Sequence, residues 1–351
     1  MLARIGLAIA IGAAGGVLAR LIGAPMPWLL GAFVASCIAT LCGLRLGPVR
    51  PDLPMRLRNL FVAVIGVMIG GSFHPDFARH LGGLWLPALG IILFVVAAHA
   101  MNFVLFRRAG GLDRTTAYYA AMPGGLIESI AFGERAGGDV QAISLQQFAR
   151  IALVITILPL LFQLATGNRV GSAAGVSFAP DTAGIAWRDW AILIFCALAG
   201  LYGGRAIRLP ASILVGPMIL SAAAHYVGLI SVGPPQWLIA SAQVVVGAGI
   251  GARFQGFAPV RVGRAFGLAL VSVAAMMLLG AGMSLLLARL IDVPFQVLFI
   301  SFAPGGVTET ALIALSLNAN PIYVTTLHVF RILLTVVIAT TTARFFSKPG
   351  A

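Results

Sequence analysis

The stretch Pro123-Gly124-Gly125-Leu126-Ile127-Glu128 occurs a second time, 181 positions later, as Pro304-Gly305-Gly306-Val307-Thr308-Glu309. Both copies lie in apolar sequence, and at the same offset Arg150 is matched by Arg331. An ionisable side chain at the centre of a membrane helix costs at least ~2.5–3.5 kcal/mol. A Pro-Gly-Gly break also frees backbone groups that protein or a water-lined cavity must satisfy. Two copies of this pattern predict a duplicated membrane protein with two matched half-sites.

The composition supports a membrane protein of several spans. The 351-residue chain is 60% hydrophobic and 9% charged, with a mean hydropathy of +1.01. Soluble domains are typically ~45–50% apolar. The 42 glycines and 19 prolines are also typical of transmembrane helices, which tolerate both residues. We therefore expect an all-α polytopic membrane protein surrounded by the lipid bilayer.

The net charge of +13 does not predict a nucleic-acid partner. The arginines are spread among short loops between apolar segments, which is the distribution of cytoplasmic loops in membrane proteins. The longest polar stretch, residues 167–189, is far shorter than the ~50 residues of a small domain. No nucleic-acid-binding module is expected.

Two repeats of six apolar segments account for the chain. The expected domains are residues 1–170 as the first membrane repeat, 171–188 as a connecting loop and 189–351 as the second membrane repeat. The motif Gly66-Val67-Met68-Ile69-Gly70 also recurs as Gly247-Ala248-Gly249-Ile250-Gly251. The segments are residues 2–19, 26–44, 57–73, 84–106, 115–133, 140–166, 189–204, 211–230, 236–252, 265–288, 294–316 and 321–343.

The distribution of basic residues favours repeats of opposite orientation. Twelve plain spans would place 13 basic residues on one side and 8 on the other. If the fifth segment of each repeat turns back at Pro-Gly-Gly, the split becomes 16 to 5, with both termini on the basic, cytoplasmic side. We therefore expect two inverted repeats, each with about five transmembrane helices plus one re-entrant or broken helix hairpin. Twelve plain spans in parallel repeats are the alternative.

Glu128 and Glu309 are the only acidic residues deep in apolar sequence. Each is expected in the first turn of the helix that leaves its break. One interpretation is local, since a carboxylate there complements the positive helix end and accepts from free N–H groups. The other is coupling to protons or cations, because burial raises the pKa of a glutamate toward neutrality.

Arg150 and Arg331 each lie in the middle of an apolar segment, three residues after Gln147 and His328 respectively. A guanidinium is always charged and needs a partner. One interpretation is a buried ion pair with Glu128 or Glu309, and the other is an anchor for an anionic substrate, which a guanidinium binds bidentately. The spacing places Gln147 and His328 on the same helical face as the arginines. His328 is either a proton relay or a hydrogen-bonded structural residue.

The breaks themselves are candidate binding elements. A half-helix that begins near the membrane centre directs free N–H groups at an anion, and glycine allows close backbone approach. The full set of expected substrate-binding residues is Pro123, Gly124, Gly125, Glu128, Gln147, Arg150, Pro304, Gly305, Gly306, Thr308, Glu309, His328 and Arg331.

Metal, cofactor and catalytic sites are not expected. Cys37, Cys42 and Cys196 lie apart in apolar context, without the spacing of a zinc site. His74, Asp76 and His80 share one loop, but their spacing fits no standard ligand set. No nucleotide-binding loop or catalytic elbow is present. The sequence therefore predicts no enzyme.

At the doubled PGGLIES (residues 123–129) and PGGVTET (residues 304–310) motifs and the paired arginines, the chain resembles the AbrB-type duplicated membrane protein family. That family is also labelled "putative ammonia monooxygenase". The resemblance covers nearly the whole chain. The family's names imply regulation of gene expression or ammonia oxidation, and its pattern supplies no site residues.

We therefore expect a secondary transporter of the bacterial inner membrane that carries a small anionic solute, with proton coupling by Glu128 and Glu309. The first alternative is a membrane-embedded regulator or sensor that acts without transport and binds a soluble partner at its basic loops. A membrane monooxygenase is the second. The sequence leaves the substrate and the formation of a homo-oligomer open.

Overall fold

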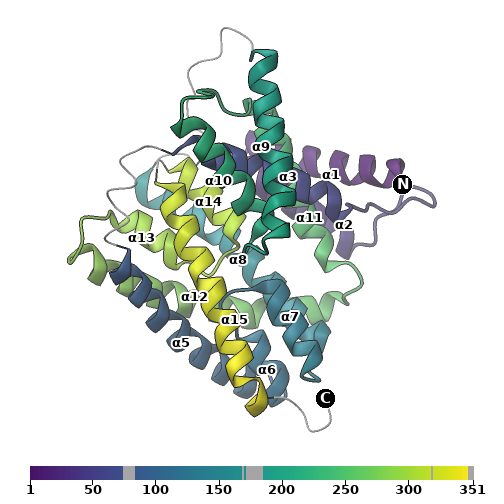
Figure 1. The fold of residues 1–351 in the computed structure, drawn as a ribbon. Helices are drawn as coiled ribbons and strands as arrows, with labels where there is room; N and C mark the ends of the chain where they lie inside the picture. Colours follow the sequence, from purple (N-terminus) through teal and green to yellow (C-terminus); the bar gives the residue numbers. More distant parts are fainter. Residues whose placement is uncertain (74–83, 168–169, 171–184, 318, 347–351) are drawn as a thin grey trace. The chain divides into compact units, whose positions relative to one another are not determined.

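The computed structural model describes residues 1–73, 84–167, 170, 185–317 and 319–346 of the chain (Figure 1). Within these residues the regular structure is entirely helical apart from an isolated β-bridge between Leu46 and Val49. The predicted all-α fold is confirmed. The loop containing His74, Asp76 and His80 lies outside the described residues, as does most of the expected connecting loop at 171–188.

Most helices of the first predicted repeat have a counterpart in the second, at the same sequence offsets as the repeated motifs. Helices α1 and α2 begin 185 positions before α9 and α10, whereas α3, α6, α7 and α8 begin 181 positions before α11, α13, α14 and α15. The helices are α1 (Leu2–Leu21), α2 (Pro27–Leu41), α3 (Met55–Gly71), α5 (Trp85–Arg108), α6 (Arg114–Ala120), α7 (Leu126–Arg135), α8 (Val140–Thr166), α9 (Trp187–Ala206), α10 (Ser212–Tyr226), α11 (Gln236–Gly251), η2 (Ala252–Phe254), α12 (Pro259–Ala288), α13 (Phe295–Phe302), α14 (Val307–Ser316) and α15 (Pro321–Phe346).

Six of the described helices are long and apolar enough to cross a membrane: α1, α5, α8, α11 with η2, α12 and α15. Helices α2 and α10 have 15 residues each, or roughly 22 Å, which is less than a ~30 Å hydrocarbon core. Both are shorter than the apolar segments that contain them. Left-handed residues at Met26 and Ala211 precede them, and Gly43 and Gly228, also with positive φ, follow them.

The chain divides into two compact units, and each unit takes helices from both predicted repeats. Unit 1 comprises residues 1–79, 156–256 and 311–322, and unit 2 comprises residues 80–155, 257–310 and 323–351. The boundary passes through α8, α14 and α15. Three-dimensional packing is therefore organised differently from the linear order of the repeats.

Unit 1 is built on reciprocal glycine contacts. A Cβ on Gly66 of α3 would lie 2.5 Å from the carbonyl oxygen of Leu214 in α10. The equivalent Gly247 of α11 meets the carbonyl oxygen of Leu29 in α2. The same contact therefore occurs twice, once between α3 and α10 and once between α11 and α2. Only glycine permits helices to approach so closely.

In unit 2 the equivalent helices α5 and α12 run antiparallel. Gly90 lies against Leu287, Asn102 accepts a 2.7 Å hydrogen bond from Ser272 Oγ, and Gly110 lies against Leu268. Along α5 the residue numbers increase while those of the contacted residues in α12 decrease, which is the pattern of antiparallel helices.

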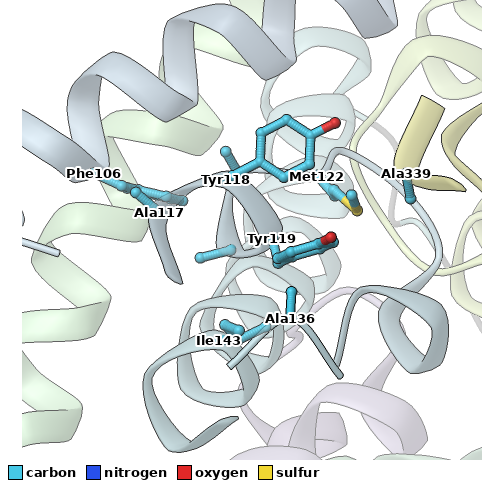
Figure 2. Packing of buried hydrophobic residues seen from close by; sticks show 10 residues of the cluster. Phe106, Ala117, Tyr118, Tyr119, Met122, Ala136, Ile143 and Ala339 are labelled. Carbon is cyan, nitrogen blue, oxygen red and sulfur yellow. The ribbon is translucent and has the colours of Figure 1, made fainter. Parts of the chain in front are cut away.

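Helices α6 and α7 form a hairpin whose two ends meet. Asp113 caps α6 by accepting from the backbone N–H of Thr115 and Thr116. Thr116 Oγ1 in turn accepts a 2.8 Å bond from the backbone N–H of Asp139, which follows α7. Figure 2 shows the buried cluster in which Tyr118, Tyr119 and Met122 of this segment pack with side chains of α5, α8 and α15, namely Phe106, Ile143 and Ala339. The chain therefore turns back on itself at the first Pro-Gly-Gly.

Candidate functional site

The two Pro-Gly-Gly motifs lie at helix breaks. The first separates α6 from α7, and the second separates α13 from α14. Gly125 adopts φ +62° as the N-cap of α7, which glycine reaches without steric cost. Ser129 Oγ donates to Gly124 O at 3.2 Å, and its equivalent Thr310 Oγ1 donates to Gly306 O at 2.8 Å. Hydroxyls at equivalent positions thus bond to a glycine carbonyl at each break, although Gly306 O also accepts the backbone N–H of Thr310.

Arg150 and Gln147 hold the end of the first entering helix. Arg150 is 6% exposed, and its Nη1 donates to Met122 O. Gln147 is fully buried, and its Nε2 donates to Ala120 O at 3.1 Å and to Met122 O at 3.2 Å. These carbonyls follow the C-terminal end of α6, where helix geometry leaves acceptors without partners. A positive charge is favourable there.

Arg331 and His328 do the same for the second break. Arg331 is 1% exposed; its Nη1 donates to Ala303 O at 2.5 Å and its Nη2 to Gly305 O at 2.8 Å. His328 is fully buried, with Nε2 bonded to Ile300 O at 3.0 Å and Nδ1 2.9 Å from Arg331 Nη2. Ala303 and Ile300 correspond to Met122 and Tyr119 at the 181-residue offset. The half-sites thus share their geometry.

Each break also lies against the long helix of the other predicted repeat. A Cβ on Gly124 would be 3.0 Å from Thr335 Oγ1 and 3.6 Å from Arg331 Nε, both on α15. A Cβ on Gly305 would be 3.0 Å from Val154 Cγ1 on α8. All of these residues belong to unit 2, so the two half-sites form one centre.

No carboxylate in the described part of the chain forms an ion pair with Arg150 or Arg331. Both guanidiniums instead donate hydrogen bonds to backbone carbonyl oxygens. The ion-pair interpretation therefore does not describe this arrangement. Glu128 and Glu309 instead fold back over the glycines of their own breaks: a Cβ on Gly125 would be 3.1 Å from Glu128 Oε2, and one on Gly306 would overlap Glu309 Oε2. The carboxylates therefore lie in the first turns of α7 and α14, where a negative charge complements the positive helix end.

The centre keeps unused hydrogen-bonding capacity. Among the described buried atoms, Arg150 Nε, Arg331 Nε and Gln147 Oε1 have no partner. The first N–H groups of α7 and α14 have no intrahelical acceptor. Two buried positive charges and two free Nε–H donors constitute an environment for an anion.

Of the remaining predicted residues, Pro123 and Pro304 are buried at the breaks, and Thr308 is 8% exposed in the first turn of α14. Sequence reasoning missed Thr335 and Val154, which lie one helical turn after Arg331 and Arg150. That i+4 spacing from a buried charge was the available signal. In the described residues no three His, Cys, Asp or Glu side chains are grouped closely enough to hold a metal.

The fold and this centre define the class of the protein: a polytopic helical membrane protein with paired broken helices and a buried arginine pair. The chain belongs to the AbrB family, because residues 28–347 match the family model described as "Transition state regulatory protein AbrB".

Two curated relatives are similar over most of their length. "Putative regulator AbrB" of Escherichia coli (strain K12) is 27% identical over 316 residues, which is 89% of this chain and 88% of the relative. "Uncharacterized protein YhjN" of Bacillus subtilis (strain 168) is 26% identical over 349 residues, covering 93% of this chain and 89% of the relative.

Proposed function

We propose that this protein is a secondary transporter of a small anionic solute in the bacterial inner membrane. The carrying observation is the pair of buried guanidiniums, Arg150 and Arg331, which meet at the helix breaks without a carboxylate partner among the described residues. A buried charge without compensation is costly. An anion bound to the two free Nε–H groups would offset that cost, and its release would restore it.

Opposite orientation of the repeats in the membrane is part of this proposal. The antiparallel run of the equivalent helices α5 and α12 supports it. So does the pocket of about 580 Å³ in which Ala109 and Gly110, after α5, line one cavity with Arg261 and Arg264 of α12. The loop after α5 and the basic first turns of α12 therefore share one end of unit 2, which fits a cytoplasmic face and cytoplasmic termini. Transporters with inverted repeats place their sites at broken helices.

Lysine variants test the anion site most directly. Arg150→Lys and Arg331→Lys keep the positive charge but lose the planar fork that binds a carboxylate at two atoms. We expect each variant to bind the transported mono- or dicarboxylate roughly 10-fold or more weakly, as measured by uptake of the labelled compound into proteoliposomes. A tenfold loss of affinity corresponds to about 1.4 kcal/mol of binding free energy. Arg264→Lys on α12 is the matched control. Unchanged affinity in both variants would remove the arginines from the site.

A regulator without transport is the second candidate. It is favoured by the family description and by the name of the Escherichia coli relative. In that case the basic loops, including Arg45 and Arg253, would bind a soluble partner, and reconstituted protein would carry no anion. Affinity capture from the cytoplasm of the native host, repeated with Arg45→Glu and Arg253→Glu, separates the two candidates when it is combined with the uptake assay.

A further inference from the structure

The hydrogen bonds of His328 fix its protonation state. A backbone carbonyl only accepts, so the 3.0 Å bond to Ile300 O requires a proton on Nε2. A guanidinium only donates, so the 2.9 Å bond from Arg331 Nη2 requires a lone pair on Nδ1. The imidazole is therefore neutral, with its proton on Nε2, for as long as Arg331 holds this position.

A carboxylate would compete with His328 for the same donor. Bidentate binding to a guanidinium uses Nε–H together with an Nη2–H. Arg331 Nε is unpaired, whereas Nη2 bonds to Gly305 O and to His328 Nδ1. An anion that takes the Nε and Nη2 edge therefore removes a hydrogen bond from Gly305 or His328. The loss at His328 exposes Nδ1 beside a negative charge, where a proton is favoured.

On this basis we propose that His328 Nδ1 is the proton-binding site of the transporter, and that it takes up one proton when an anion binds to Arg331. The inference rests on the proposed function and assigns the coupling to His328 rather than to Glu128 or Glu309. The proton comes from water and leaves with the anion. No covalent step is involved. Because linkage is reciprocal, protonation of His328 also strengthens anion binding.

The charged groups around His328 are consistent with this order of events. On its own helix Arg331 faces Nδ1, and a proton there would place two donors and two positive charges 2.9 Å apart. On α14, Thr310 Oγ1 is 3.5 Å from Nδ1 and the neighbouring Glu309 is 4% exposed. The described residues of α13 carry no charge, and α8 contributes Arg150. Proton binding therefore requires that Arg331 move or be neutralised first.

The first half-site lacks this capability, and it supplies the matched control. Gln147 occupies the position of His328 and donates to equivalent carbonyls, but an amide does not titrate. His328→Gln keeps a donor for Ile300 O and removes the proton site. In proteoliposomes with the exterior two pH units more acidic, one proton per monovalent anion supports accumulation up to about 100-fold. We expect wild type to concentrate its anion under this gradient and H328Q to lose that concentration.

Glutamate variants separate the inference from its rival. If Glu309→Gln loses accumulation while H328Q keeps it, the assignment to His328 is overturned. If E309Q keeps accumulation and H328Q loses it, the assignment is supported.

A second measurement needs no transported ligand. Nitrogen NMR of histidine-labelled protein, with the His328 signal assigned by its absence in H328Q, should show a neutral Nε2–H imidazole at pH 5 in wild type. In Arg331→Met, which removes the donor to Nδ1, the same imidazole should become protonated at pH 5. A charged His328 in wild type, or a neutral one in both proteins, would overturn the inference. Absence of any anion uptake by wild type would instead sink the proposed function, and the NMR result would still decide the proton site.

Discussion

The two half-sites have the same backbone arrangement and different chemistry. In both, an arginine and the residue three positions before it donate to the carbonyls that end a half-helix. The first half-site uses Gln147 and leaves Glu128 partly exposed, whereas the second uses His328 and buries Glu309 to 4% exposure. Duplication thus preserved the support for the broken helices. Titratable chemistry is concentrated in the second half-site.

Arg331 and Arg150 differ in the number of hydrogen bonds that they make to their half-sites. Arg331 bonds to two carbonyls and to His328, but Arg150 bonds to one carbonyl. Each buried group that loses its partner costs about 1–3 kcal/mol. We therefore expect Arg331→Met to lower the free energy of unfolding by at least about 2 kcal/mol more than Arg150→Met does. The desolvation of the charge is common to both variants and cancels in the comparison. Denaturant titration of detergent-solubilised protein measures the difference, and equal losses would mean that the half-sites are equally supported.

The next largest difference in stability is expected at Gly125 and Gly306, the glycines just before α7 and α14. Gly306→Ala would drive a Cβ into the Glu309 carboxylate, so we expect a loss of about 1–3 kcal/mol that Glu309→Ala largely relieves. Gly125→Ala should cost a similar amount for a different reason, since Gly125 has φ +62°. Its partner variant Glu128→Ala should give no relief.

A double-mutant cycle at each break, read by thermal unfolding, tests this contrast. A coupling energy above about 0.5 kcal/mol is expected for Gly306 with Glu309, and none for Gly125 with Glu128. Equal coupling at both breaks would show that the glutamates are held in the same way.

The sequence predicted the elements of the centre well, because each carries a strong local cost. Pro-Gly-Gly at residues 123–125 and 304–306 breaks a helix wherever it occurs, and a charge such as Arg150 in apolar sequence must be satisfied. The 181-residue offset then indicated which copies correspond. The helix break, the buried charge and the repeat offset all depend on residue type and spacing, which can be read directly from the sequence.

Partner choice was not predictable in the same way. The sequence left Arg150 and Arg331 open to an ion pair with Glu128 or Glu309, because opposite charges near in sequence suggest pairing. In the structure, the carbonyl oxygens of residues 122, 303 and 305 accept hydrogen bonds from the guanidiniums. Backbone acceptors carry no sequence signal. The mixing of both repeats in each compact unit has no sequence signal either, since it depends on glycine contacts between α3 and α10 and between α11 and α2.

The smallest expected contrast concerns the glycines at the centre of each break. A Cβ on Gly124 would meet the rotatable hydroxyl of Thr335 at 3.0 Å, and we expect Gly124→Ala to cost less than about 1 kcal/mol. A Cβ on Gly305 would lie 2.7 Å from Thr310 Cγ2 and 3.0 Å from Val154 Cγ1. Because Val154 is a β-branched side chain with a stiff rotamer, Gly305→Ala should cost about 1 kcal/mol more. Val154→Ala should relieve part of that cost and leave Gly124→Ala unaffected. If thermal unfolding ranked the two glycine variants the other way, the close approach of Gly305 to α8 would not exist in the folded protein.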